Sequence, residues 1–348
     1  MKRNSILAMI IALMISQSIM ADECDSYCNT NDFSDCLCDP CSSWSFDVDW
    51  IWWKVRRYGL DYAVVGKGNV SIDFATEELP QGKTHYIEPD RDSGFRIAFF
   101  KGCDCWDLGI RYTHFKTNET EKLNRLAETD IFATRAQSSG DIANPGLVDL
   151  ATSKYAIDLN MIDLEFGYRV DFECFDGNVR PFTGAKITYI DQSMKTIYEL
   201  INASEIQDNL IEEKLDFDAY GLYCGLEGQL EDVWCKVGFF GRTSVAISLA
   251  NIESQFLQYD FDGLEIQNLE VQAKNDKWCI IPYYEVAFGL QYDVCDFLCV
   301  DWSVQLGYEF HQWCDMEDFI NFISTKKISR DKANLGIDGL FLRFCGSY

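Results

Sequence analysis

Long segments of the chain alternate between apolar and polar residues with a period of two, and this alternation limits the possible folds more than any other feature. Between residues 44 and 52 the even positions are all apolar: Trp44, Phe46, Val48, Trp50 and Trp52. Such a pattern predicts β-strands with one apolar and one polar face. After residue 21, no uncharged apolar run approaches the roughly 18 residues that a membrane helix needs. If the mature chain spans a bilayer, it does so with strands.

About ten such strands are predicted, and the segments between them are of two kinds. Short turns lie near residues 103, 175, 231 and 296, the third of them at Glu231-Asp232. Long polar segments occupy residues 54–90, 116–154, 190–216, 248–277 and 313–333. Tight turns and both termini at one end, with long loops at the other, are typical of a bacterial outer-membrane barrel. In the last strand the alternation shifts phase at Asp338-Gly339, which predicts a β-bulge.

Two further segments leave the number of strands open. Tyr62–Val65 and Val70–Phe74 flank a glycine-rich turn, and Gln255–Phe261 and Leu264–Val271 flank Asp262-Gly263, a strong hairpin signal. These segments are either outer extensions of the ten strands or extra hairpins, which would raise the count to 12 or 14.

A soluble β-sandwich also alternates, but the strand length, the placement of aromatic residues and the loop asymmetry along the whole chain favour a transmembrane barrel. The predicted strands run about 9–11 residues or more, the length of a tilted membrane strand, whereas soluble strands have about 5–6. Aromatic residues lie near the ends of the apolar faces, as in interfacial girdles. The apolar residues Leu340, Leu342 and Phe344 alternate toward the C-terminal Tyr348, which resembles the insertion signal of such barrels. The sequence therefore predicts an all-β antiparallel transmembrane barrel in the bacterial outer membrane.

Several short aromatic motifs resemble one known family. They are Ser45–Lys54 (SFDVDWIWWK), Gly59–Ala63 (GLDYA), Trp106–Phe115 (WDLGIRYTHF), Leu306–Phe310 (LGYEF) and Asn334–Leu340 (NLGIDGL). Together they are similar to the major outer membrane protein family of Legionella and Chlamydia-related bacteria. The resemblance extends over most of residues 44–344. It implies a pore-forming, disulfide-cross-linked outer-membrane protein, and it supplies no catalytic residues.

The N-terminal region divides into two segments that precede the barrel. Lys2 and Arg3 followed by an apolar stretch predict a secretory signal peptide over residues 1–21, with cleavage after Ser18 or after Ala21. Removing the two basic residues takes the net charge from −26 to −28. Residues 22–43 are polar and rich in cysteine, so they cannot build a core and predict a periplasmic leader. The barrel is expected over residues 44–348.

The 15 cysteines predict an oxidising compartment and disulfide bonds. Their spacing in the leader fits no standard zinc pattern, so no metal site is expected there. Twelve of the cysteines gather at the tight-turn end or in the leader, and they are the disulfide candidates: Cys24, Cys28, Cys36, Cys38, Cys41, Cys103, Cys105, Cys174, Cys235, Cys295, Cys299 and Cys345. We expect this side to cross-link barrels to each other or to other cysteine-rich envelope proteins. Stapling of turns within one chain is the alternative.

Charged residues of both signs occupy the polar faces of the strands and are expected to line the lumen. The predicted pore-lining residues are Asp47, Asp49, Arg96, Asp107, Arg111, Asp163, Glu165, Arg169, Lys186, Arg242, Glu285 and Glu309, and Glu227, Lys236 and Arg343 share the same faces. A barrel of about eight strands is filled by side chains, and a wide channel needs about 16–18. Ten strands allow either a lumen closed by salt bridges or a narrow passage for small solutes or ions.

Two functions are consistent with these sequence features. One is a porin-like protein that also reinforces the envelope through disulfides, and the other is a non-conducting structural barrel or adhesin with acidic outer loops. The acidic charge excludes nucleic acid as a partner, and no cofactor is expected. A rim protease of the omptin type would need a histidine close to acids, but the Asp-x-His pattern is absent around His85, His114 and His311. We therefore do not expect an enzyme.

Overall fold

The computed structural model describes residues 42–67, 82–103, 105–126, 129–135, 147–172, 177–199, 208–234, 236–261, 266–297, 300–324 and 327–348. These residues belong to a compact unit that spans Ser43–Tyr348, apart from residue 42. The predicted signal peptide and nearly all of the leader therefore lie outside the described residues. Within the described part of the chain, no helix is long and apolar enough to cross a membrane.

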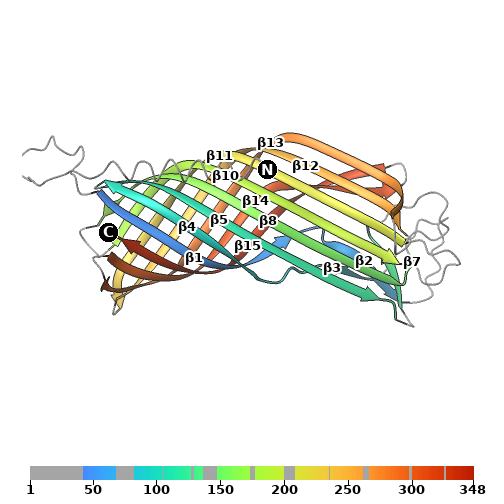
Figure 1. Ribbon diagram of the computed structural model, residues 1–348, viewed down its shortest axis with the longest axis horizontal. Helices are drawn as coiled ribbons and strands as arrows, with labels where there is room; N and C mark the ends of the chain where they lie inside the picture. The colour runs from blue at the N-terminus through green and yellow to red at the C-terminus, as the bar shows by residue number, and fades with distance from the viewer. Residues whose placement is uncertain are drawn as a thin grey trace, which may run out of the picture. The chain divides into compact units, whose positions relative to one another are not determined.

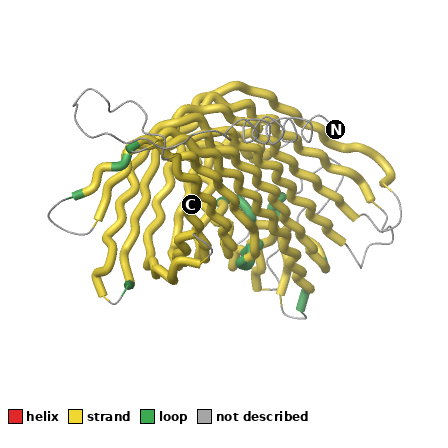
Figure 2. The backbone as a smooth tube through the Cα atoms, turned by 60° about the vertical axis from the view of Figure 1, so that its left-hand side comes forward, coloured by secondary structure: helices red, strands yellow, loops and turns green. Residues whose placement is uncertain are grey.

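Ten antiparallel strands close into one barrel, as the alternation predicts (Figures 1 and 2). The first and last strands pair from Ser45 with Ser347 to Arg57 with Leu335, and this pairing closes the ring. In order around the ring the strands are β1 (Ser42–Arg57), β4 (Asp92–Cys103), β5 (Trp106–Asn124), β8 (Leu150–Tyr168), β10 (Gly177–Glu199), β11 (Asp208–Trp234), β12 (Val237–Phe261), β13 (Ile266–Phe297), β14 (Val300–Ser324) and β15 (Lys327–Ser347).

The pairing corrects two details of the sequence prediction. The turn expected at Glu231-Asp232 lies a few residues later, because Trp234 pairs with Val237 and Lys236 takes the left-handed conformation with φ of 68°. The bulge expected at Asp338-Gly339 is absent from the described ladders, where both residues pair in regular register with β1 and with β14. The phase shift arises because Asp338 faces outward, where Arg56 and the Tyr308 hydroxyl bond to its carboxylate.

The two ambiguous hairpins add no strands to the barrel. Gln255–Phe261 and residues 266–271 are outer ends of β12 and β13, which pair as far as Phe261 with Ile266. Tyr62–Val65 belongs to β2 (Asp61–Lys67), the centre of a separate small sheet. The order of this sheet is β3 (Lys83–Tyr86), β2, β6 (Thr129–Ala133) and β7 (Leu147–Val148). The segment Val70–Phe74 lies outside the described residues.

The polarity of the two barrel faces reverses along the strands, as β12 illustrates. Between Phe239 and Leu249 most outward side chains are apolar and exposed, and the inward side chains include buried Arg242 and Ser244. Beyond Leu249 the inward face carries the buried apolar residues Ile252 and Phe256, and the outward face begins with the polar residues Asn251, Glu253 and Gln255. An apolar outer face suits lipid and a polar one suits water. The strands therefore cross the membrane with one half and project beyond it with the other.

We call the projecting part the outer extension, which comprises residues 150–161 of β8, 190–199 of β10, 208–219 of β11 and 250–261 of β12. Its inward apolar side chains, among them Tyr155 and Ile211, share one buried cluster with Leu60, Tyr62 and Ile131 around the small sheet. The small sheet therefore packs against the inner wall of the outer extension. Burial of this apolar surface, worth about 25 cal/mol per Å², holds it there.

Candidate functional site

A belt of charged side chains crosses the lumen at membrane level, and each of the ten strands contributes one of them. In ring order they are Asp49, Arg96, Asp107, Glu165, Arg180, Glu227, Arg242, Glu285, Glu309 and Arg343. Eight of the ten residues are buried, and Asp107 and Glu227 are half-buried. Buried charges must be paired and hydrogen-bonded, because an unpaired charge in a low-dielectric interior is strongly destabilising.

One half of the belt is built around Asp49. Its carboxylate accepts hydrogen bonds from Arg343 Nε at 2.8 Å and from Arg96 Nη1 at 2.9 Å. Arg96 also binds Glu309 with Nη2 at 3.0 Å from both carboxylate oxygens, and Trp53 Nε1 donates to Glu309 Oε1 at 2.8 Å. These contacts join β15, β1, β4 and β14 across the lumen.

The other half is built around Glu165. Arg242 Nη2 and Arg180 Nη1 each lie 2.5 Å from one of its oxygens, and the Tyr223 hydroxyl donates to it at 3.0 Å. Arg242 Nη1 also binds Glu227 Oε2 at 3.0 Å. Arg180 forms a bidentate pair with Asp107, with Nε 2.6 Å from Oδ2. Five strands, from β5 to β12, are joined in this way.

His311 and Tyr283 connect the two halves. His311 Nε2 lies 3.5 Å from Glu309 Oε2, and His311 Nδ1 lies 2.7 Å from the Tyr283 hydroxyl. The same hydroxyl donates to Glu285 Oε2 at 3.3 Å, and Arg242 Nε lies 3.5 Å from Glu285 Oε1. The polar contacts therefore form one network around the inside of the barrel.

The predicted pore-lining residues fall into three groups in the structure. Nine are buried inside the barrel: Asp49, Arg96, Arg111, Asp163, Glu165, Lys186, Arg242, Glu285 and Glu309. Asp47 and Asp107 are half-buried, and Arg169 is exposed near the tight-turn end, although it borders the lumen. Lys236 lies in a turn and not on an inward face.

Sequence reasoning missed several members of the network. Arg180 lies six residues before Lys186 on the same strand. Because this spacing is even, it predicts that both side chains face the lumen. Pro181 and the inward Phe182 interrupt the alternation there and hide the signal. Trp53 and Tyr283 were assigned to no polar role, because an aromatic residue on a strand gives no indication of the hydrogen bond that it makes.

The small sheet is anchored to the outer extension above the belt. Arg135 binds Glu213 of β11 bidentately, at 2.8 and 2.9 Å, and its Nε donates to the Asp61 carbonyl at 2.8 Å. Burial alone would lower the pKa of Arg135, but the carboxylates of Glu213 and Asp61 raise it above its usual range. The Tyr198 hydroxyl of β10 donates to the Tyr62 carbonyl at 2.5 Å, and burial raises the pKa of Tyr198.

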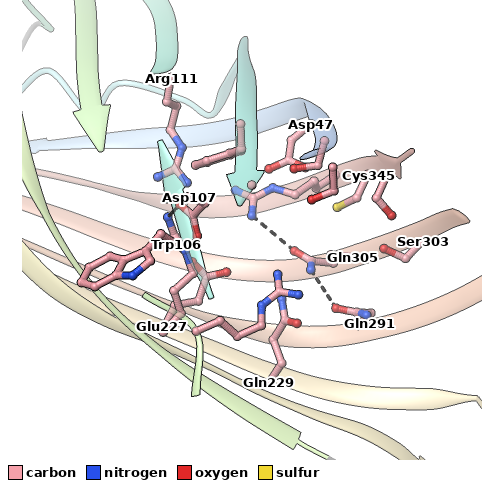
Figure 3. Close-up of a pocket in the computed structure, with 18 of the residues that line it drawn as sticks. Asp47, Trp106, Asp107, Arg111, Glu227, Gln229, Gln291, Ser303, Gln305 and Cys345 are labelled. Atoms are coloured by element: carbon pink, nitrogen blue, oxygen red, sulfur yellow. Dashed lines mark hydrogen bonds and ion pairs between the residues drawn. The ribbon is translucent and has the colours of Figure 1, made fainter. Parts of the chain in front are cut away.

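Below the belt, a cavity of about 240 Å³ opens at the tight-turn end (Figure 3). Ser43, Cys105, Arg169 and Ser347 border it where the strands begin and end, and Asp107 and Glu227 of the belt form part of its wall. The lumen thus has three levels in the described residues: the cavity, the charged belt, and the outer extension with the small sheet.

The described histidines and cysteines do not assemble into a single site. His85 lies in β3, His114 faces outward and contacts Asn160 at 3.0 Å, and His311 lies in the belt. Among the twelve disulfide candidates, only Cys105 and Cys345 have described side chains, and both are free thiols there. The backbone is described at Cys103 and Cys295 without the side chains, and the other eight candidates lie outside the described residues.

Comparison with known families identifies the chain. The family described as the Legionella pneumophila major outer membrane protein precursor matches residues 38–345. The chain belongs to this family. Membership places the protein in the bacterial outer membrane, as the sequence predicts. No curated protein matches the chain closely enough to count as a relative.

Several solved outer-membrane proteins resemble this family member at low identity. The outer membrane protease OmpT from Escherichia coli is 13% identical, with 87% of this chain and 95% of OmpT covered and a TM-score of 0.39. A FadL homologue from Pseudomonas aeruginosa is 8% identical over 88% of this chain and 90% of its own, with a TM-score of 0.24. The toluene transporter TodX from P. putida is 7% identical over 89% and 90%, with a TM-score of 0.24.

Proposed function

We propose that this protein is a non-conducting structural barrel that presents its outer extension at the cell surface. The observation that carries the proposal is the filling of the lumen at two successive levels. At membrane level, charged residues from all ten strands are paired across the barrel, as in Arg96 with Asp49 and Glu309. Above it, the small sheet packs against the inner wall. A solute could pass through the lumen only if both the charge pairs at membrane level and the packing of the small sheet were disrupted.

The pairing at membrane level gives the closed lumen a physical reason. A ten-stranded barrel is only slightly wider than the eight-stranded barrels that side chains fill completely. Long side chains such as Arg242 and Glu165 reach each other across such an interior, as their 2.5 Å contact illustrates. Opening the belt would leave several buried charges without partners, at about 3–5 kcal/mol for each broken pair.

The outer extension supports a role at the surface. Its outward face is polar and carries many carboxylates, including Glu212 and Asp216 on β11 and Glu253 on β12. Strands of 25–27 residues, as in β11 and β12, are far longer than crossing the membrane requires. The extra length builds a rigid platform beyond the lipid.

We further propose that the tight-turn end anchors this barrel in the envelope through disulfides. Cys105 is an exposed thiol at that end, where an oxidising partner in the periplasm could reach it. A bond between two such thiols removes two hydrogens, which a periplasmic disulfide-exchange partner would accept. A purely structural barrel gains mechanical strength from such links without any need for a pore.

We also propose that the protein is not an enzyme. His311, the one described histidine within the charged belt, shares a hydrogen bond with the Tyr283 hydroxyl through Nδ1, and its buried Nε2 lies 3.5 Å from Glu309 Oε2. His114 lies on the opposite, outward face. No two described histidines share a cavity with which they could act on a substrate.

Recording from single molecules in planar bilayers tests the proposed closure against the porin-like alternative. We expect folded protein to insert without discrete conductance steps, whereas a wide porin of about 16–18 strands in the same membranes conducts. Discrete, voltage-stable steps from folded monomers would overturn the proposal and establish a pore.

For the anchoring role, we expect Cys105→Ser to weaken high-mass bands of envelopes on gels run without reductant. Unchanged monomeric bands with and without reductant would refute cross-linking.

A further inference from the structure

Two opposite charges face the cavity at the tight-turn end from neighbouring parts of its wall. Asp47 lies on β1 and Arg111 on β5, with β4 between them, and both border the cavity (Figure 3). Arg111 pairs with Ala98 of β4. Gly102 lies next to Ser43, and Gly94 lies next to Ile51, so the same register places Asp47 beside Ala98.

Asp47, Ala98 and Arg111 thus form one row across three strands. Two strand spacings separate the outer members of the row, which is about 10 Å between their backbones. Ala98 is small and uncharged, so β4 contributes no charged side chain to this row.

Neither charged side chain in the row has a direct partner among the described residues. No hydrogen bond or ion pair joins the side chain of Asp47 or Arg111 to another described residue, and Arg111 Nε is buried without a hydrogen bond. Arg111 is only 4% exposed. The carboxylate across the ladder from it, Asp163, is already engaged by Lys186 at 2.6 Å. Arg111 is therefore a buried cation that borders the cavity and has no direct hydrogen bond or ion pair among the described residues, although carboxylates such as Glu165 lie near enough to interact with its charge.

A buried guanidinium without partners is destabilising, so such a group in a cavity indicates a ligand that completes it. The other belt cations on this wall are satisfied, since Arg343 binds Asp49 and Arg180 binds Asp107. Arg169 also borders the cavity, but it is exposed, so Arg111 is the buried cation that the ligand must suit, together with Asp47.

Apart from the aromatic Phe100 and Trp106 and the charged residues, most of the remaining lining is neutral and polar. Ser45 and Ser303 border the cavity, and Gln305 donates to Gln291 at 2.9 Å. Amide and hydroxyl groups suit the hydrogen-bonding groups of a small polar solute rather than an apolar one. The volume of about 240 Å³ is below the roughly 300–1,000 Å³ typical of sites for drug-sized ligands, so the occupant is small.

We propose that this cavity binds a small zwitterion of the α-amino-acid class, with its carboxylate on Arg111 and its ammonium group on Asp47. A solute with only one charge would leave the opposite group of the row unsatisfied. The cavity opens at the tight-turn end, which faces the periplasm in outer-membrane barrels. The site is therefore supplied from the periplasm, and its occupancy does not depend on whether the lumen conducts.

Calorimetric titration of the refolded barrel in detergent tests the proposal with three probes. L-glutamine carries both charges, propionate carries the carboxylate alone, and propylamine carries the ammonium group alone. We expect L-glutamine to bind at least about tenfold more tightly than either single-charge probe, because it makes a charge-assisted hydrogen bond at each end. Equal affinity for all three probes, or no binding of L-glutamine, would overturn the proposal.

Two variants separate the roles of the two charges. Asp47→Asn should lower L-glutamine affinity about tenfold or more and leave propionate binding unchanged. Arg111→Gln should lower the affinity for both L-glutamine and propionate by the same order and leave propylamine binding unchanged. Lys116→Gln, which removes an exposed charge on the outward face, serves as the control and should bind like the wild type.

The folding of each variant is checked by its heat-dependent migration on gels. The side chain of Asp47 is half-buried and has no hydrogen bond or ion pair to another described residue, so we expect Asp47→Asn to fold. If Arg111→Gln does not fold, Asp47→Asn still tests the proposal. Unchanged L-glutamine affinity in folded Asp47→Asn would refute the ammonium site, and unchanged propionate affinity in folded Arg111→Gln would refute the carboxylate site.

Discussion

The ion pair between Lys186 and Asp163 offers a clean measure of how strongly buried charges hold the lumen together. Lys186 Nζ lies 2.6 Å from Asp163 Oδ1, and the two side chains are 1% and 4% exposed. The Lys186 ammonium group also lies 4.8 Å from the ring centre of Tyr283 and 5.3 Å from that of Tyr223. Removal of either partner leaves the other charge in an interior that water does not reach.

Lys186→Met leaves the Asp163 carboxylate unpaired and also removes the ring contacts, so we expect it to lower the free energy of unfolding by about 3–5 kcal/mol. Asp163→Asn keeps the ammonium group over the two rings. Because a desolvated cation–π contact is worth about 2 kcal/mol, we expect this variant to lose about 2–3 kcal/mol. The double variant Lys186→Met/Asp163→Leu removes both charges and should lie within about 1 kcal/mol of the wild type.

Equilibrium unfolding in urea, with the barrel folded in lipid vesicles and followed by tryptophan fluorescence, measures these values. The exposed pair between Lys274 and Glu253 is a matched control, because it has the same 2.6 Å separation but side chains that are 54% and 39% exposed. Lys274→Met should leave the unfolding midpoint unchanged, since solvent screens such pairs. If the two buried single variants lose less than about 1 kcal/mol, or if their losses simply add in the double variant, the reasoning about buried charge pairs in the lumen is wrong.

Three further predictions concern the small sheet and the membrane boundary. Burial raises the pKa of Tyr198. Its hydroxyl therefore contributes stability that is complete below the unfolded pKa of about 10 and is lost as the pH rises further. Tyr198→Phe should abolish this alkaline loss of stability, measured by unfolding at a series of pH values. Arg135→Met should raise the rate of tryptic cleavage in the small sheet by roughly tenfold while the barrel stays folded on gels, because about 1.4 kcal/mol of anchoring corresponds to that factor. Exposed Cys224, which faces lipid on β11, should react with a lipid-soluble maleimide and not with a charged one, whereas Cys105 at the tight-turn end should react with both; equal reactivity of Cys224 toward both reagents would place the membrane boundary elsewhere.

Much of the membrane half of the barrel could be predicted from sequence, as Asp49 and Glu165 illustrate. Each alternates with apolar neighbours, and the structure places each on the inward face. The outer extension could be predicted less well, because Ile252 and Phe256 also alternate but face inward. Alternation identifies the two faces of a strand, and the solvent on each side decides which face turns inward.

The charged belt was visible only in part. The residue types at Arg96 and Glu309 were predicted to face the lumen, yet their pairing joins strands that are far apart in sequence. Arg343 meets Asp49 only because the last strand closes on the first. Partners separated by nearly the whole chain leave no local trace in the sequence.

The sequence by itself determined the strands, the antiparallel barrel and its place in the outer membrane. These properties follow from the two-residue period of the strand backbone and from the burial of apolar side chains in lipid, which act locally on each segment. Only the tertiary structure decided that the small sheet enters the lumen, which charges pair, and that Arg111 and Asp47 face a cavity without partners. Those outcomes depend on the closed ring, since closure alone sets the width of the lumen and brings side chains from opposite walls within reach of each other.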